Sequence, residues 1–134
     1  MATSSRYSYL THLECSACGA VCAPDGLPGL CECGKPLLAR YDYVAAAREF
    51  PRDALAGRVA SMWRYHEMLP AESADAIVSL GEGWTPLVAA SRLGRRYDLS
   101  HVYVKDEALN PTGSFKARGM SAAVTMAAAN GATA

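Results

Sequence analysis

The chain is organised around one stretch, which reads Val102-Tyr103-Val104-Lys105-Asp106-Glu107-Ala108-Leu109-Asn110-Pro111-Thr112-Gly113-Ser114-Phe115-Lys116-Ala117-Arg118-Gly119. Residues 101–105 alternate in polarity, which predicts a half-buried β-strand. Asn110-Pro111-Thr112-Gly113 predicts a turn, because proline disfavours a helical conformation at the preceding residue and glycine permits backbone conformations closed to other residues. The stretch therefore predicts a strand, a turn and then a new element.

That new element is a helix, because apolar residues recur at helical spacing from Met120 to Ala128. We expect Ser114 to be its N-cap and Lys116 to lie in its first turn. The positive end of a helix dipole disfavours an ammonium ion and favours a partly neutral, nucleophilic amine. The alternative is a solvated surface lysine, as most lysines are.

The motif from Lys105 to Gly119 resembles the lysine motif of fold-type II pyridoxal-phosphate enzymes, in the form carried by threonine synthases. A second stretch, Ser79-Leu80-Gly81-Glu82-Gly83-Trp84-Thr85-Pro86-Leu87, is similar to the family segment that precedes the lysine strand. The resemblance implies that Lys116 is both the cofactor-binding residue, holding pyridoxal 5'-phosphate as a Schiff base, and the catalytic acid and base. Ala117 departs from the aspartate that many members carry there.

Composition limits the remaining classes of function. The chain has 134 residues, 51% of them hydrophobic, and 13 basic residues balance 13 acidic ones. One domain's worth of globular protein is expected, and neither a nucleic acid nor a membrane is an expected partner. No apolar run approaches the roughly 20 residues that span a bilayer, and residues 1–13 lack the pattern of a signal peptide. We therefore expect a cytoplasmic protein with reduced cysteines.

All five cysteines lie between Cys15 and Cys33. Cys15-x-x-Cys18 is typical of one half of a zinc knuckle, and the pair Cys31 and Cys33 would supply the other half. Because the second pair is one residue tighter than usual, either the knuckle is irregular or Cys22 replaces one ligand. Threonine synthases commonly begin with a similar zinc-ribbon-like segment, so we expect structural zinc on Cys15, Cys18, Cys31 and Cys33. The alternative is a packed ribbon with free thiols.

Three segments are expected: a zinc-ribbon-like segment at 10–42, a helical connection at 43–76, and the first part of a pyridoxal-phosphate-binding α/β domain at 77–134. Within the connection, Asp42 predicts a cap for a helix over 43–49, and apolar residues from Leu55 to Trp63 predict a second helix. Residues 91–96 predict a short helix. The resemblance implies the α/β fold class, as the N-terminal part of the fold-type II, tryptophan synthase β-like fold.

The sequence stops after one strand and helix, whereas a right-handed crossover needs another parallel strand. We therefore expect an N-terminal fragment that is inactive alone. For the complete enzyme the resemblance implies conversion of O-phospho-L-homoserine and water to L-threonine and phosphate, and it leaves room for a homo-oligomer. The alternatives are a cysteate synthase or a threonine or serine dehydratase of the same fold, or a non-catalytic zinc-ribbon interaction module.

Overall fold

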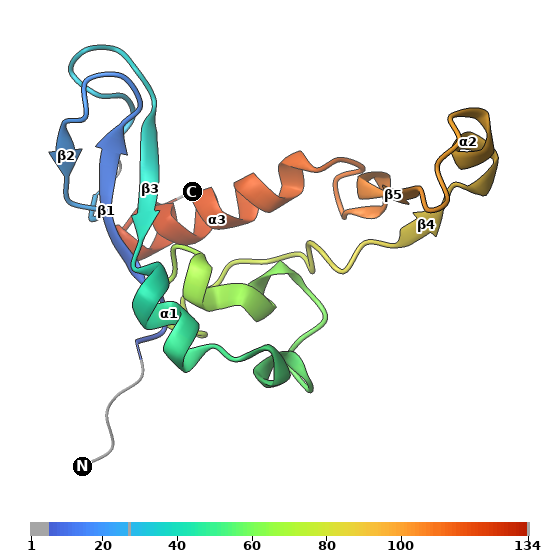
Figure 1. The fold of residues 1–134 in the computed structure, drawn as a ribbon. Helices are drawn as coiled ribbons and strands as arrows, with labels where there is room; N and C mark the ends of the chain where they lie inside the picture. The colour runs from blue at the N-terminus through green and yellow to red at the C-terminus, as the bar shows by residue number, and fades with distance from the viewer. Residues whose placement is uncertain (1–5, 27, 134) are drawn as a thin grey trace.

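An antiparallel three-stranded sheet lies near the start of the chain, in a computed structural model that describes residues 6–26 and 28–133 (Figure 1). The central strand β1 (Leu10–Cys15) pairs with β2 (Val21–Cys22) on one side and with β3 (Leu37–Tyr41) on the other. Little apolar surface is buried here, and Leu30 and Val21 are exposed. We call residues 10–41 the ribbon.

Helix α1 (Tyr43–Glu49) follows the ribbon directly and begins as predicted. The Asp42 carboxylate accepts a hydrogen bond of 2.9 Å from the backbone N–H of Ala45, which satisfies one of the free donors of the first turn. The helix ends at Phe50, before Pro51.

The predicted second helix over 55–63 is wrong. The chain instead forms two short 3₁₀ segments, η1 (Arg52–Leu55) and η2 (Met62–Met68). Between them Gly57 adopts a φ of +81°, and Ser61 is extended and accepts a hydrogen bond from the Trp63 N–H. Both features stop an i to i−4 ladder from continuing, so the apolar spacing is used for packing without a helix.

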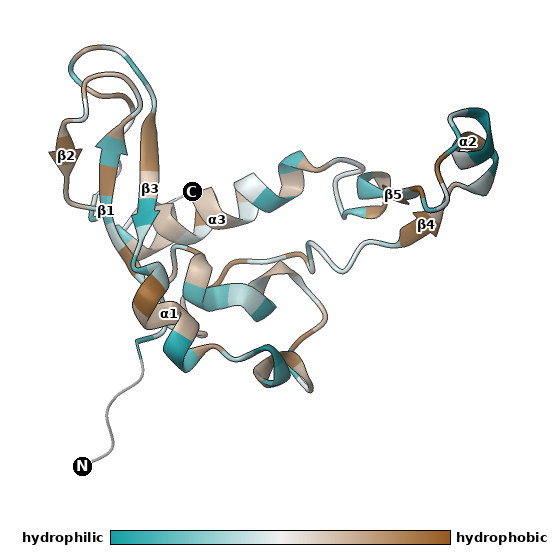
Figure 2. Cartoon of the chain, viewed as in Figure 1, coloured by the Kyte–Doolittle hydropathy of each residue, from teal (hydrophilic) through white to brown (hydrophobic). Residues whose placement is uncertain are grey.

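A second, two-stranded antiparallel sheet projects from the rest of the molecule in Figure 1. It pairs β4 (Leu87–Ala89) with β5 (Tyr103–Lys105), and the predicted helix between them is present as α2 (Ser91–Arg96). Strand β5 is shorter than the expected 101–105. Figure 2 shows hydrophobic residues on both strands, and all six strand residues are exposed.

Helix α3 (Lys116–Ala129) crosses the molecule, and its Ala122 packs against the small apolar core formed by Met62, Trp63 and Ala71. Trp63 is buried against α3 and donates a hydrogen bond of 2.9 Å from its indole N–H to the Ser121 hydroxyl. Ser121 in turn donates to the Val78 carbonyl, and the Val78 N–H donates to the buried Thr125 hydroxyl. Small polar residues of α3 therefore hold the segment that leads to β4 against the helix.

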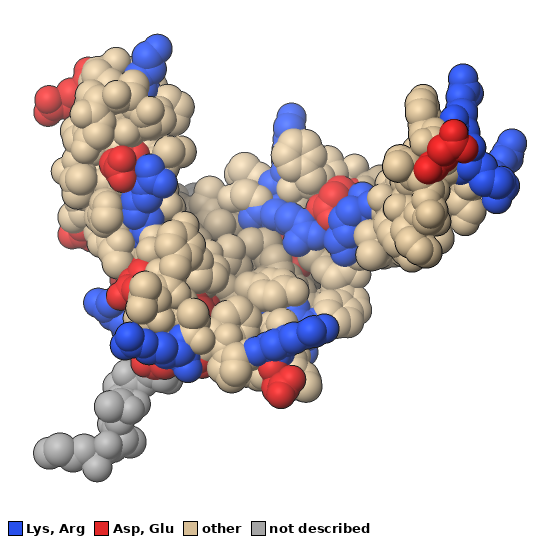
Figure 3. All heavy atoms as spheres, in the orientation of Figure 1, with Lys and Arg blue, Asp and Glu red and all other residues tan. Residues whose placement is uncertain are grey.

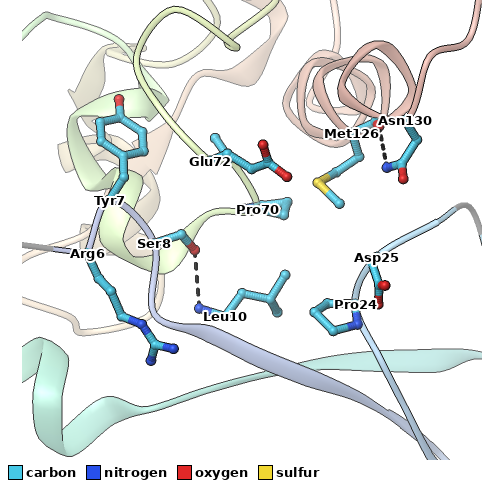
Figure 4. A pocket seen from close by; sticks show the side chains of 11 residues that line it. Arg6, Tyr7, Ser8, Leu10, Pro24, Asp25, Pro70, Glu72, Met126 and Asn130 are labelled. Carbon is cyan, nitrogen blue, oxygen red and sulfur yellow. Dashed lines mark hydrogen bonds between the residues drawn. The ribbon is translucent and has the colours of Figure 1, made fainter.

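The surface carries both signs of charge, and Figure 3 shows basic and acidic side chains interspersed over one face. Among the described residues, no helix is long and apolar enough to cross a membrane. A cavity of about 370 Å³ lies where the ribbon loop meets the C-terminal end of α3, with Asp25 and Met126 on its wall (Figure 4). Asn130 accepts a hydrogen bond from the Gly26 N–H beside it, which attaches the ribbon to the helix.

The architecture is thus mixed α and β, as expected at the level of class. The strand pairs in the described part of the chain are all antiparallel. The ribbon and the lysine motif lie toward opposite ends of α3 (Figure 1).

Candidate functional site

The lysine motif forms a loop that the backbone shapes as the sequence predicts. We call residues 110–116 the lysine loop. Asn110 is extended before Pro111, and Gly113 adopts a φ of +68° and donates its N–H to the Asn110 carbonyl at 2.8 Å. A side chain is strained at such a φ, so glycine is suited to this position.

The prediction that Ser114 caps α3 is wrong. No side-chain hydrogen bond caps the helix, and the residue that precedes it is Phe115. The Ala117 N–H bonds to the Ser114 carbonyl and the Arg118 N–H to the Phe115 carbonyl, so the first turn is tightened to i to i+3 bonds. These bonds satisfy donors that a serine hydroxyl would otherwise have served.

Lys116 is the first residue of α3 and its side chain is exposed. Among the described residues, no hydrogen bond or ion pair engages its amine. The amine is therefore free to reach a carbonyl compound near the positive end of a helix of 14 residues.

Glu107 connects the lysine motif to the second motif. It lies in the 3₁₀ turn η3 (Glu107–Leu109), and its carboxylate forms a bidentate ion pair with Arg118, at 2.7 Å to both Nε and Nη2. The Thr85 hydroxyl donates to Oε1 at 2.6 Å, and the Asn110 amide donates to Oε2 at 2.9 Å. Hydrogen bonds from Arg118 and then from Thr85 hold the pKa of this carboxyl well below its usual range.

A hydrogen bond between the Asn110 side chain and the Gly83 backbone joins the two motifs. Asn110 is 4% exposed, and its side-chain oxygen accepts a hydrogen bond of 3.0 Å from the Gly83 N–H. Gly83 adopts a φ of +98°, and a Cβ there would lie 2.5 Å from the Met62 backbone nitrogen and 3.1 Å from Arg118 Nη1. The Lys105 ammonium group donates to the Thr85 carbonyl. The two motifs thus form one polar cluster around Glu107.

Sequence reasoning gave Thr85, Glu107 and Arg118 no role, and it assigned Asn110 only to the turn. Thr85, Asn110 and Arg118 lie 22, 3 and 11 residues from Glu107. Spacing along the chain does not indicate such contacts. The sequence offered one signal for them, namely that the polar residues of two separate motifs needed hydrogen-bond partners.

The four cysteines of the predicted knuckle form a second site. The Sγ atoms of Cys15, Cys18, Cys31 and Cys33 all lie within 4.8 Å of one another, with 3.5 Å between Cys15 and Cys33 and 3.7 Å between Cys18 and Cys31. We call these four residues the cysteine cluster. Four thiolates at about 2.3 Å from a tetrahedral zinc ion would be separated by about 3.8 Å, so this donor set fits zinc.

The thiols of the cluster differ in acidity. Hydrogen bonds from the backbone N–H groups of Cys18 and Ala17 lower the pKa of the Cys15 thiol to about 6. The hydrogen bond with Cys15 raises the pKa of the Cys33 thiol to about 12. Neighbouring thiols resist joint ionisation, and a divalent cation would remove that repulsion.

Cys22 lies outside this group of four. It is in β2, opposite Leu13 of β1, and is partly buried. Of the two alternatives left open by the sequence, the geometry favours the irregular knuckle with Cys31 and Cys33 over a knuckle in which Cys22 replaces one of them.

Comparison with known proteins relates the chain to one family. Residues 78–134 match the profile of the family described as "Pyridoxal-phosphate dependent enzyme". The threonine synthase of Methanocaldococcus jannaschii is 42% identical over 114 residues, which are 85% of this chain and 28% of that protein. The threonine synthase of Methanosarcina acetivorans is 38% identical over 117 residues, which are 87% of this chain and 28% of that protein.

A third threonine synthase, that of Mycobacterium leprae, is 49% identical over 67 residues, or 50% of this chain and 18% of that protein. No solved structure gives a significant match. The chain spans just over a quarter of the length of the Methanocaldococcus jannaschii and Methanosarcina acetivorans proteins. These matches confirm the resemblance that the two motifs predicted.

Proposed function

We propose that this chain, which resembles the threonine synthases and carries the sequence of the pyridoxal-phosphate dependent enzyme family over residues 78–134, acts in a threonine synthase. The reaction would convert O-phospho-L-homoserine and water to L-threonine and phosphate. Lys116 would be the cofactor-binding and catalytic residue. The protein would be cytoplasmic, with a small molecule as its substrate.

The observation that carries the proposal is the state of Lys116. Its side chain is exposed at the first residue of α3, no described residue engages its amine, and the loop before it is fixed by Asn110 and Gly113. A lysine that holds an aldehyde cofactor needs a free amine, and a defined position makes the bond productive. These features fit pyridoxal phosphate.

Two tasks for Lys116 follow. Its Nζ would hold the cofactor aldehyde at rest, and when free the same nitrogen would accept the proton from the substrate Cα. Pyridoxal phosphate supplies an electron sink for negative charge at that carbon.

We also propose a structural zinc ion on the cysteine cluster. The separations of the sulfur atoms and the low pKa of Cys15 support it. The zinc-ribbon-like segment at 10–42 would be its own unit, followed by the connection at 43–76 and the first part of the fold-type II cofactor domain at 77–134. Structural zinc stabilises a ribbon that buries little apolar surface.

The activity is tested on the complete polypeptide that contains this sequence. Incubation with pyridoxal phosphate and O-phospho-L-homoserine should release phosphate and threonine in equal amounts. Borohydride reduction followed by peptide mass spectrometry should place the cofactor mass on Lys116. Cofactor mass on another lysine would contradict the assignment, and ammonia release from threonine or serine without phosphate chemistry would indicate a dehydratase.

Zinc is tested by metal analysis of protein purified without chelators. We expect close to one zinc per chain in the wild type and in Cys22→Ser, and loss of zinc in Cys18→Ser. A wild-type protein free of metal would leave the packed ribbon with free thiols.

A further inference from the structure

We propose that Glu107 and Arg118 are positioning residues that orient the Lys116 amine. Their ion pair holds α3 on the side opposite to the lysine. The inference deepens the proposed function, and its meaning for cofactor binding rests on that function. Neither residue is proposed to touch the reacting atoms.

The first argument is the geometry of α3. Residues of an α-helix are separated by about 100° around the axis, so Arg118 points about 200° away from Lys116. Arg118 is held by Glu107 from η3 and by the Thr85 hydroxyl at 3.2 Å. One face of α3 is therefore attached to Glu107 and Thr85, and the face that carries Lys116 is exposed.

The second argument is that the Glu107 carboxylate is saturated. A carboxylate offers about four acceptor sites on two oxygens. Oε1 accepts from Thr85 at 2.6 Å and from Arg118 Nη2 at 2.7 Å, and Oε2 accepts from Arg118 Nε at 2.7 Å and from Asn110 Nδ2 at 2.9 Å. Four donors occupy four sites, so this carboxylate has no capacity left for a substrate proton. Its role is to hold other residues.

The third argument is that these contacts lie on both sides of the lysine loop. Asn110 begins the loop and binds Glu107 through its side-chain amide, and Arg118 follows the loop by two residues and binds the same carboxylate. Glu107 and Arg118 are only partly buried, with side chains 24% and 32% exposed. A bidentate pair in this setting restricts direction more than it adds stability. Lys116 therefore lies between Asn110 and Arg118, which both bind the Glu107 carboxylate.

The experiment compares variants of the complete polypeptide with two measurements. The first is hydrogen exchange of the loop amides 112–118 without cofactor. The second is the rate at which added pyridoxal phosphate becomes fixed to Lys116 by borohydride. Glu107→Gln keeps the shape but replaces an acceptor oxygen by a donor, and should speed exchange and slow fixation, each by about tenfold. Arg118→Lys keeps the positive charge but loses the two-donor geometry of the guanidinium. It should therefore also speed exchange and slow fixation.

The matched control is Glu14→Gln, which removes the carboxylate of another Arg–Glu pair, Arg40 with Glu14, at 2.8 Å in the ribbon. It should leave both measurements at the wild-type value. Equal loop exchange in Glu107→Gln, Arg118→Lys and wild type overturns the proposal. So does faster exchange with an unchanged fixation rate, because the contacts would then hold the loop without directing the amine.

Failure of the proposed function gives a different result. If the wild type fixes no cofactor at Lys116, the function is wrong, and loop exchange alone decides whether Glu107 and Arg118 hold the loop. If Glu107→Gln does not fold, Thr85→Val removes one donor to the same carboxylate with little change in shape. Its expected effect on both measurements has the same direction and is smaller, and no effect overturns the proposal.

Discussion

The ribbon and the cluster around Glu107 are both held with little apolar burial, and they differ in what replaces it. In the ribbon, Cys15 is buried, while Leu30 is 63% exposed. Around Glu107, two polar residues that bind its carboxylate are buried, namely Thr85 and Asn110. The ribbon thus brings four thiols together, whereas the Glu107 cluster has hydrogen bonds that are already complete within the chain.

This difference indicates whether each region needs a bound metal or ligand to keep its structure. The thiols of the cysteine cluster are adjacent, and a cation would join them, so the ribbon should respond to metal. The Glu107 cluster has its donors and acceptors matched, so it should keep its shape without a ligand and respond to loss of single side chains. The predictions below test this contrast.

The largest effect is expected at the lysine. Lys116→Ala in the complete polypeptide should lower turnover by at least about 10³-fold, because alanine offers neither a bond to the cofactor nor a group that moves protons. Phosphate release measures it. Lys35→Ala, which removes an exposed lysine of the ribbon, is the control and should keep wild-type turnover. Normal turnover in Lys116→Ala would refute the assignment.

Metal removal should affect one region and spare the other. A chelator should speed hydrogen exchange of β1 and β3 by about tenfold or more, because metal binding and folding of such a ribbon are coupled. Exchange at 107–118 should stay unchanged. A ribbon that exchanges equally with and without chelator would show that packing alone holds it.

The buried amide of Asn110 should matter for stability. Asn110→Ala removes its bonds to Glu107 and leaves the Gly83 N–H without its acceptor, which should lower the free energy of unfolding by about 2 kcal/mol. Chemical denaturation measures the loss. Asn130→Ala, at an exposed amide with two hydrogen bonds, is the comparison and should cost less. Equal losses would mean that burial of Asn110 adds nothing.

The smallest effect is a dependence on acidity. The pKa of Glu107 is lower in the folded chain than its ordinary value, so its contribution to stability is present above about pH 4.5 and is lost as pH falls toward the folded pKa. Unfolding measured from pH 6 down to pH 3 should show a shallower decline in Glu107→Gln than in wild type. Parallel curves would assign the decline to other carboxylates.

Local features of the fold could be predicted from the sequence. The turn at 110–113, the cap at Asp42 and the short helix at 91–96 all depend on residues within a few positions of one another. Proline, glycine and a carboxylate at a helix start restrict the backbone by themselves, so no tertiary information is needed. The four cysteines were also identified as a group from their spacing.

Part of what failed depended on contacts distant in sequence. The second helix was expected from the spacing of apolar residues up to Trp63, but Gly57 and Ser61 interrupt the helix there. The hydrogen bond of Trp63 to Ser121 then fixes the course of the backbone. The role of Glu107 was missed because its partners Thr85 and Arg118 come from other elements. Such pairings follow from the fold and cannot be obtained from spacing.

Gly83 has a consequence for which substitutions the chain can tolerate. A side chain there would meet the Met62 backbone on one side and Arg118 on the other, whereas at Gly81, with a similar φ of +91°, nothing lies within 4 Å. In a library of random variants under selection for growth, position 83 should therefore return glycine alone, while position 81 should return occasional asparagine or aspartate. Two glycines that look equivalent in the sequence would then differ in the substitutions that they tolerate.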